Sequence, residues 1–290
     1  MSLLTTKSSE ILEQLSQHQI YQDPINRVNW LRLSLDDFWL PEEALSLYGV
    51  SEFMVLPIEQ RRALSHFEYL HMLEANVWFE GLFMERLAQS ASYARRNVAL
   101  LKFHLNELRE EAGHSLAFAE IIQRSGLPRV QTRFHKARWI NRFARKSSMD
   151  SVTFWLTAML GQEIPDRINR VIRQHKSDVC HAIYDVATFS TVDEARHINF
   201  SRRMVDAGVK ELSPVRAKLL RYVLQRTLDQ FVSVYFYPQH GTYDFAGLVP
   251  GRCWSSLAQK NPHRKQFIRK QLTGILHNLE QVGIQLSWKP

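Results

Sequence analysis

A pattern of acidic and histidine residues occurs twice in the chain and constrains the fold more than any other feature. Residues 110–114 read EEAGH and residues 193–197 read DEARH, so each segment has a glutamate followed three residues later by a histidine. In both cases another glutamate precedes this pair by 31 residues, and the whole pattern repeats with an offset of 83 residues. The two copies consist of Glu80, Glu111 and His114, and of Glu163, Glu194 and His197.

The rest of the chain predicts helices around this pattern. Apolar residues recur at three- and four-residue steps, and strand-like alternation is scarce. Gly126 is typical of a helix end, and Asp150 or Ser151 of a helix start. Ser177 or Asp178 could start the following helix. We expect helices over about residues 57–89, 95–125, 151–175, 178–208, 213–236 and 262–282.

These helices predict an all-α protein with a four-helix bundle core and additional N- and C-terminal helices, and the repeated Glu and His residues resemble the arrangement in ferritin-like bundles. With 290 residues, of which 45% are hydrophobic, the chain is long enough to bury a sizeable core. We expect a single domain over residues 1–290, in which residues 1–56 form an N-terminal extension, residues 57–208 the core, and residues 209–290 flanking helices.

The repeated spacing is consistent with two antiparallel helix hairpins. Residues at the same height of a hairpin lie symmetrically about its turn, and the midpoints, 95–96 and 178–179, fall at or near polar breaks. Within each Glu-x-x-His the two side chains share one helix face. Packed together, the hairpins would direct four carboxylates and two imidazoles at one centre, a ligand set that suits two iron or manganese ions.

The acidic residue before each motif glutamate is a candidate partner for a ligating histidine. Such histidines usually donate their free N–H to a carboxylate. We expect crossed pairs, Asp193 with His114 and Glu110 with His197. The sequence identifies no catalytic residue beyond the metal ligands. A third Glu-x-x-His, Glu68 with His71, has no counterpart 83 residues later, and we expect it to be an exposed pair on a helix surface.

At these residues the chain resembles the carboxylate-bridged diiron oxygenases of the ferritin-like superfamily. EEAGH and DEARH look like the paired motifs of acyl-carrier-protein desaturases and bacterial multicomponent monooxygenases. The closest resemblance is to the arylamine N-oxygenases of the AurF type, over roughly residues 57–208. It implies one iron at Glu80, Glu111 and His114 and another at Glu163, Glu194 and His197, with bridging glutamates; manganese or a mixed centre is the alternative.

The sequence departs from that family at one position. The family adds a third histidine one turn before the last motif glutamate, where this chain has Ser190. The extra ligand is missing unless His181 or another histidine supplies it. Ser190 and Thr191 could hydrogen-bond a ligand at the metals, but we expect them to bond the backbone of their own helix.

Three functions are compatible with these residues. The first is a diiron oxygenase that uses O2 to N-oxygenate an aryl-amine-like substrate in specialised metabolism. The second is a diiron desaturase or C–H hydroxylase that acts on an acyl group held by an acidic carrier protein, and the third is a ferritin-like iron-binding protein without enzymatic activity. An oxygenase would need an external electron donor, because no iron–sulfur or dinucleotide motif is present.

Charge and composition limit the classes of partner that the protein could bind. The net charge is +8, and residues 129–146 contain seven Lys or Arg and no acid, a segment that could dock an acidic carrier protein. No nucleic-acid-binding motif, signal peptide or membrane span of roughly 18–20 apolar residues is present, so we expect a cytoplasmic protein. The sequence is also compatible with a homodimer.

The sequence does not identify the substrate-binding residues. Candidates for the pocket wall, most of which we expect to belong to the core, are Phe83, Met84, Phe118, Met159 and Leu160.

Overall fold

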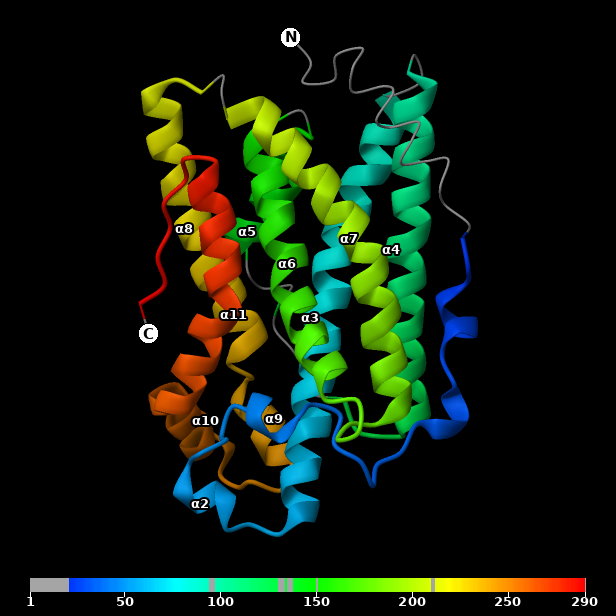
Figure 1. Ribbon diagram of the computed structural model, residues 1–290, viewed down its shortest axis with the longest axis vertical. Coiled ribbons are helices and arrows are strands. Elements are labelled where there is room, and N and C mark those ends of the chain that lie inside the picture. Colours follow the sequence, from blue (N-terminus) through cyan, green and yellow to red (C-terminus); the bar gives the residue numbers. More distant parts are fainter. Residues whose placement is uncertain are drawn as a thin grey trace.

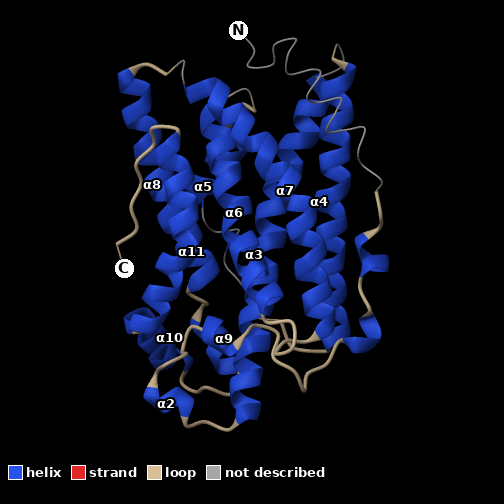
Figure 2. Ribbon diagram, viewed as in Figure 1, coloured by secondary structure: helices blue, strands red, loops and turns tan. Residues whose placement is uncertain are grey.

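The structure is a computed structural model that describes residues 21–93, 97–129, 134, 138–149, 151–209 and 212–289. Figure 2 shows that the regular elements in these residues are helices, without a strand among them. The all-α class is therefore confirmed, and the arrangement fits a ferritin-like helical bundle.

Four long helices form the centre of the molecule (Figure 1). They are α3 (Ile58–Tyr93), α4 (Val98–Ser125), α6 (Val152–Gln174) and α7 (His181–Val209). The most extensive contacts between elements are those of α6 with α7 and of α3 with α4. Each pair is joined by a short connection, so the core consists of two antiparallel hairpins, as the repeated spacing predicts.

Local sequence signals explain three ends of the core helices. The side chain of Asn97 accepts a hydrogen bond from the Leu100 N–H at 3.1 Å, and Ser151 accepts one from the Phe154 N–H at 3.2 Å. At the other end of α4, Gly126 adopts the left-handed φ of 64° that favours glycine after a helix.

The predicted start of α7 is wrong. Neither Ser177 nor Asp178 caps this helix, which begins at His181. The Asp178 N–H instead donates to the carbonyl of His175 at 2.9 Å, so this residue belongs to the turn that follows α6. The carbonyl of Cys180 accepts the first hydrogen bond of α7, from the Tyr184 N–H at 3.0 Å.

Further helices pack on one side and one end of the bundle (Figure 1). Helices α8 (Pro214–Phe236) and α11 (Pro262–Gln281) match their predicted ranges and contact α6. The sequence did not predict α2 (Ser51–Met54), α5 (Arg138–Lys146), α9 (His240–Phe245), α10 (Gly251–Lys260), or the 3-10 turns η1 (Pro24–Arg27), η2 (Trp30–Arg32) and η3 (Glu42–Ala44). These elements are short, and their hydrophobic periodicity is too brief to be recognised.

The expectation of an exposed pair at Glu68 and His71 is also wrong, because both side chains are buried. The Glu68 carboxylate accepts hydrogen bonds from the backbone N–H and hydroxyl of Ser46, and burial raises its pKa. The His71 Nε2 lies 2.9 Å from the carbonyl of Val234, and burial lowers its pKa to about 4. Residues 42–48 and α8 cover this face of α3, which helical periodicity alone could not indicate.

Candidate metal centre

The six predicted ligands lie on the four core helices. Glu80 belongs to α3, Glu111 and His114 to α4, Glu163 to α6, and Glu194 and His197 to α7. All six residues are buried, and none is more than 9% exposed. Ionised carboxylates are costly to bury unless they gain a partner, so this concentration of acids requires compensating charge.

Five of the six residues form two overlapping groups. Glu80, Glu111 and His114 each offer a ligand atom within 4.8 Å of the others, and the same holds for Glu111, Glu194 and His197. Glu111 belongs to both groups. A carboxylate shared in this way can bridge two cations, so the arrangement favours two ions close together rather than two separate sites.

Both histidines turn the same ring nitrogen towards the glutamates. The Nδ1 atom of His197 lies 3.1 Å from Glu111 Oε1 and 3.6 Å from Glu194 Oε2, and the Nδ1 atom of His114 lies 3.8 Å from Glu194 Oε1. Glu111 Oε1, Glu194 Oε2 and His197 Nδ1 have no hydrogen-bond partner in the described part of the chain. Buried acceptors without a donor fit a bound cation, and the residues present therefore suit a metal centre.

The opposite ring nitrogens face two further acids. His114 Nε2 lies 3.3 Å from Asp193 Oδ2, and His197 Nε2 lies 3.0 Å from Glu110 Oε2. These are the two crossed contacts expected from the sequence. A proton held on Nε2 by such a carboxylate leaves the lone pair of Nδ1 available to a metal ion.

Arginine side chains stabilise these two acids. Arg196 donates to Glu110 at 2.7 Å, and Arg27 donates to Asp193 at 2.7 Å. Burial alone would raise the pKa of both carboxyl groups, but the hydrogen bonds from the histidines and the arginine charges outweigh it and lower both pKa values. Both acids are therefore ionised and able to accept a hydrogen bond from the ring N–H.

Glu163 is not among the groups of ligand-type residues described above. Its Oε1 accepts a hydrogen bond from Arg202 Nη2 at 2.7 Å, and its Oε2 lies 4.0 Å from Arg167. The Oε2 atom has no hydrogen-bond partner in the described residues. One oxygen of Glu163 is therefore free of competing bonds, and its role as a ligand is a proposal.

Two residues near the centre were not predicted from the sequence. Glu107 is buried one turn before Glu111, with Oε2 3.1 Å from His197 Nε2, and burial raises its pKa to about 8. The four-residue spacing from Glu111 could have revealed it. Tyr235 on α8 has a buried hydroxyl without a partner in the described residues, and burial and the charge of Glu80 raise its pKa well above the usual value. No sequence signal links Tyr235 to the repeat.

The structure shows the surroundings of Ser190, the residue that stands where the family has a third histidine. Ser190 and Thr191 are buried, and their hydroxyl groups have no hydrogen-bond partner in the described residues, so the expected bonds to their own helix backbone are not formed. His181 lies at the start of α7, with Nδ1 3.5 Å from Asp185, and it belongs to none of the metal-type groups of the described residues. His181 therefore does not replace the missing ligand in this arrangement.

A comparison with protein families gives a match over nearly the whole chain. Residues 5–283 match the family described as p-aminobenzoate N-oxygenase AurF. The chain belongs to this family. The AurF family consists of oxygenases of the diiron type that act on aryl-amines, so the resemblance inferred from the two motifs is confirmed. In a sequence comparison, no curated protein matched the chain.

Membership of the AurF family also bears on the other predictions. It favours an oxygenase over a non-enzymatic iron-binding protein, and it implies O2 and an amine substrate. Among the described residues, no helix of this AurF-family protein is long and apolar enough to cross a membrane. The basic segment predicted as a docking surface lies partly outside the described residues, and within it Arg129 and Arg145 pair with Glu74 and Glu85 of α3.

Two cavities lie beside this centre in the AurF-family protein. The first has mainly polar lining residues and is partly open, with about 340 Å³ of space free of protein atoms, part of which is open solvent. Its wall includes three predicted ligands and several polar residues, among them Glu80, His114, Glu194, Asn76, Gln162, Asp166, Ser190 and Phe118. Metal ions bound to the glutamates would therefore have one open side that faces a polar chamber.

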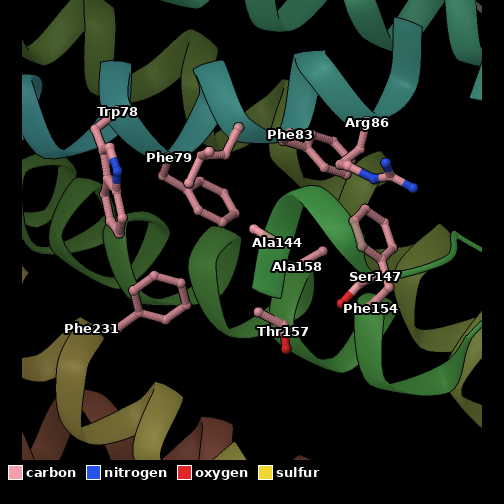
Figure 3. Close-up of a pocket in the computed structure, with 11 residues that line it drawn as sticks. Trp78, Phe79, Phe83, Arg86, Ala144, Ser147, Phe154, Thr157, Ala158 and Phe231 are labelled. Carbon is pink, nitrogen blue, oxygen red and sulfur yellow. The ribbon is translucent and has the colours of Figure 1, made fainter. Parts of the chain in front are cut away.

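The second cavity is apolar and partly open to solvent, with about 450 Å³ of space free of protein atoms, part of which is open solvent (Figure 3). Its wall is mainly aromatic and includes Trp78, Phe79, Phe83, Phe154 and Phe231, with Arg86 at one end. Of the predicted pocket residues, Phe83 lines this cavity and Phe118 the polar one, whereas Met84, Met159 and Leu160 line neither.

Phe79 belongs to the walls of both cavities and separates them. It directly precedes the predicted ligand Glu80 in the chain. A Cβ atom added at Gly161 would lie 2.1 Å from the Phe79 ring, so only glycine leaves room for the ring in this position. Phe79 therefore lies between the aromatic cavity and the cavity that Glu80 and Glu194 line.

Metal binding to this AurF-family protein should weaken as the pH falls. Burial and the charge of Glu111 raise the pKa values of Glu80 and Glu194. Raised carboxyl pKa values stabilise the metal-free protein at low pH, and this contribution is lost as the pH rises through them. A divalent ion must displace these protons. The increase in Tm on adding iron(II) or manganese(II) should therefore be larger near about pH 7.5 than near about pH 5.5.

Thermal unfolding with and without metal at both pH values measures this effect. The variant Glu111→Ala serves as the control for metal ions bound elsewhere on the surface. An equal or larger increase in Tm at the lower pH would contradict the assignment of these carboxylates as ligands.

Proposed function

We propose that the protein is an iron-dependent N-oxygenase of an aromatic primary amine, acting in specialised metabolism. The observation that supports this most strongly is the pair of Glu and His groups that share Glu111, in a chain that belongs to the AurF family. The match to an N-oxygenase family favours this reaction over acyl desaturation and over iron storage. The reaction converts Ar–NH2, O2, two electrons and two protons into Ar–NHOH and water.

One iron would be held by Glu80, Glu111 and His114, and the second by Glu194, His197 and one oxygen of Glu163. Carboxylate and imidazole ligands suit iron and manganese alike, and the diiron type of the family favours iron. Bound iron supplies the activation of O2, and the protein supplies binding, orientation and the exclusion of water. The two electrons come from a separate reductant, as the lack of redox-cofactor motifs in the sequence suggests.

The residues of the chain have defined tasks in this reaction. Asp193 and Glu110 hold the Nε2 protons of the two histidines, which keeps each Nδ1 directed at the centre. The burial of the ligands excludes bulk water from the site of O2 activation. Ser190, in the place of a third histidine, adds no charge and leaves a hydroxyl exposed to the polar cavity.

The apolar cavity is suited to the aromatic ring of the substrate. Its aromatic wall offers edge and face contacts to a planar ring (Figure 3). The amino group would then point past Phe79 towards Glu80 and Glu194. Arg86 is the charged residue among the described residues of this wall, and it favours an anionic substituent at the far end of the ring.

Product formation with isotopically labelled O2 tests the proposed function. The protein is loaded anaerobically with iron(II), reduced, and exposed to the gas with p-aminobenzoate or aniline as the probe. We expect an N-oxygenated product that carries the label, and none from Glu194→Ala treated in the same way. Loaded protein that consumes O2 but yields no N–O bond with either amine would contradict the proposal.

A further inference from the structure

The two halves of the centre differ at one position that matters for the ligands. The offset of 83 residues relates Glu110 to Asp193 and Gly113 to Arg196. Arg196 of the second motif donates to Glu110 of the first motif at 2.7 Å. By the same relation, a residue at position 113 would pair with Asp193. Glycine has no side chain, so the repeat itself leaves Asp193 without an equivalent arginine.

An arginine from the N-terminal segment stands in this place. Arg27 Nη1 lies 2.7 Å from Asp193 Oδ2, and the same oxygen lies 3.3 Å from His114 Nε2. The distance equals that of Arg196 from Glu110 on the other side. Arg196 itself approaches Asp193 only to 3.8 Å, at its other oxygen. Each half of the centre therefore has an arginine, a carboxylate and a histidine in contact. In one half the arginine is Arg196 of the repeat, and in the other it is Arg27 of the N-terminal segment.

The glycine that breaks the repeat also admits the segment that carries Arg27. A Cβ atom at Gly113 would lie 2.9 Å from Cγ of Pro24 and 3.2 Å from the hydroxyl of Tyr21. The turn η1, capped by the side chain of Asp23, contacts both α4 and α7, and Figure 1 shows this part of the chain in dark blue along the edge of the bundle. Position 113 therefore has no side chain because another segment packs there.

Burial and a ring contact fix the Arg27 side chain. It is 23% exposed, and its guanidinium lies 5.0 Å from the centre of the Phe189 ring. A partly buried arginine with a carboxylate partner and a ring contact loses little further freedom when it holds that carboxylate. Its position is therefore better defined than that of a surface ion pair.

We propose that Arg27 is a positioning residue of the metal centre. It holds the Asp193 carboxylate in place, so that Asp193 accepts a hydrogen bond from His114 Nε2 and the Nδ1 atom faces the centre. Through Arg27, the N-terminal segment then contributes a side chain to the metal centre in addition to packing against the bundle. This inference rests on the metal binding contained in the proposed function. Loss of such an outer contact typically costs about 10- to 100-fold in metal affinity.

Metal titration of variants tests the role of Arg27. Affinities for manganese(II) and cobalt(II) are measured by competition with a chelator, and the visible spectrum of bound cobalt(II) reports on its ligands. Arg27→Ala should weaken one of two ions by about tenfold or more and change the cobalt spectrum. Arg27→Lys, which retains the charge, should recover part of the affinity. Arg196→Ala should weaken the other ion to a similar extent.

Arg109→Ala is the matched control for the segment itself. The Arg109 guanidinium lies 4.2 Å from the centre of the Tyr21 ring, and no contact of Arg109 with Asp193 occurs among the described residues, so its loss removes one contact of the segment while the bond of Arg27 to Asp193 stays in place. It should bind both ions as the wild type does. The proposal is overturned if Arg27→Ala binds both ions with wild-type affinity, or if Arg109→Ala weakens binding equally. Failure of the wild type to bind two ions would instead refute the metal centre, so the two failures are distinguishable.

Discussion

Replacing Glu111 by alanine should remove both metal ions together and abolish N-oxygenation. Glu111 is the residue that the two ligand groups share, so its loss takes one carboxylate from each ion. Glu80→Ala, which affects one group, should retain part of the metal. We expect the metal content after anaerobic loading to fall from about two ions per chain to less than about 0.5 in the first variant. Elemental analysis after removal of free metal measures this directly.

The stability of the metal-free variant separates this explanation from misfolding. The negative charge of Glu111 contributes to the raised pKa values of Glu80 and Glu194, so the metal-free site contains repelling carboxylates. Removing one of them should leave the Tm of the metal-free protein unchanged or higher. Glu111→Ala protein that still binds two ions, or one that loses metal only because it unfolds, would contradict the assignment of Glu111 as the shared ligand.

Filling the aromatic cavity should abolish turnover while the metal centre stays intact. Ala158 on α6 points into this cavity (Figure 3), and a phenylalanine there would occupy the space proposed for the substrate ring. We expect Ala158→Phe to lower kcat/KM by at least about 100-fold. The aromatic ring of the substrate could no longer enter the cavity, so its binding energy would not stabilise the transition state. The iron content should equal that of the wild type. Product formation and metal analysis on the same sample provide the measurement.

Thr157→Val is the matched control for this cavity. It changes the adjacent lining residue without changing its shape, and the Thr157 hydroxyl has no hydrogen-bond partner in the described residues. Its kcat/KM should stay close to the wild-type value, because the hydroxyl that it removes makes no hydrogen bond in the described residues. Wild-type activity in Ala158→Phe would show that the amine binds elsewhere.

The internal repeat explains how much of the site could be predicted from the sequence. Helical spacing fixes which side chains share a face, so the spacing alone predicts the five neighbouring side chains Glu80, Glu111, His114, Glu194 and His197. The same reasoning cannot specify the rotamer of a long side chain. Glu163 illustrates this limit, because its contact with an arginine two turns beyond the motif depends on the packed α6–α7 pair.

Other parts depend on contacts between distant segments, for which periodicity carries no signal. The turn with Arg27 and the helix with Tyr235 lie outside the repeat, and nothing in their own sequence indicates that they reach the centre. The burial of Glu68 likewise results from coverage by residues far along the chain. Short helices such as α10, which follows Pro250 and begins with a glycine, lack the length that makes a helical pattern recognisable.

The number of iron ions bound per chain is the measurement that tests the central claim most directly. The wild-type protein is loaded with iron(II) without oxygen, freed of unbound metal, and analysed for iron and protein in the same sample. Two groups that share Glu111 predict about two ions per chain. No stoichiometric iron, or a single ion that Glu111→Ala still retains, would contradict a dinuclear centre at these residues.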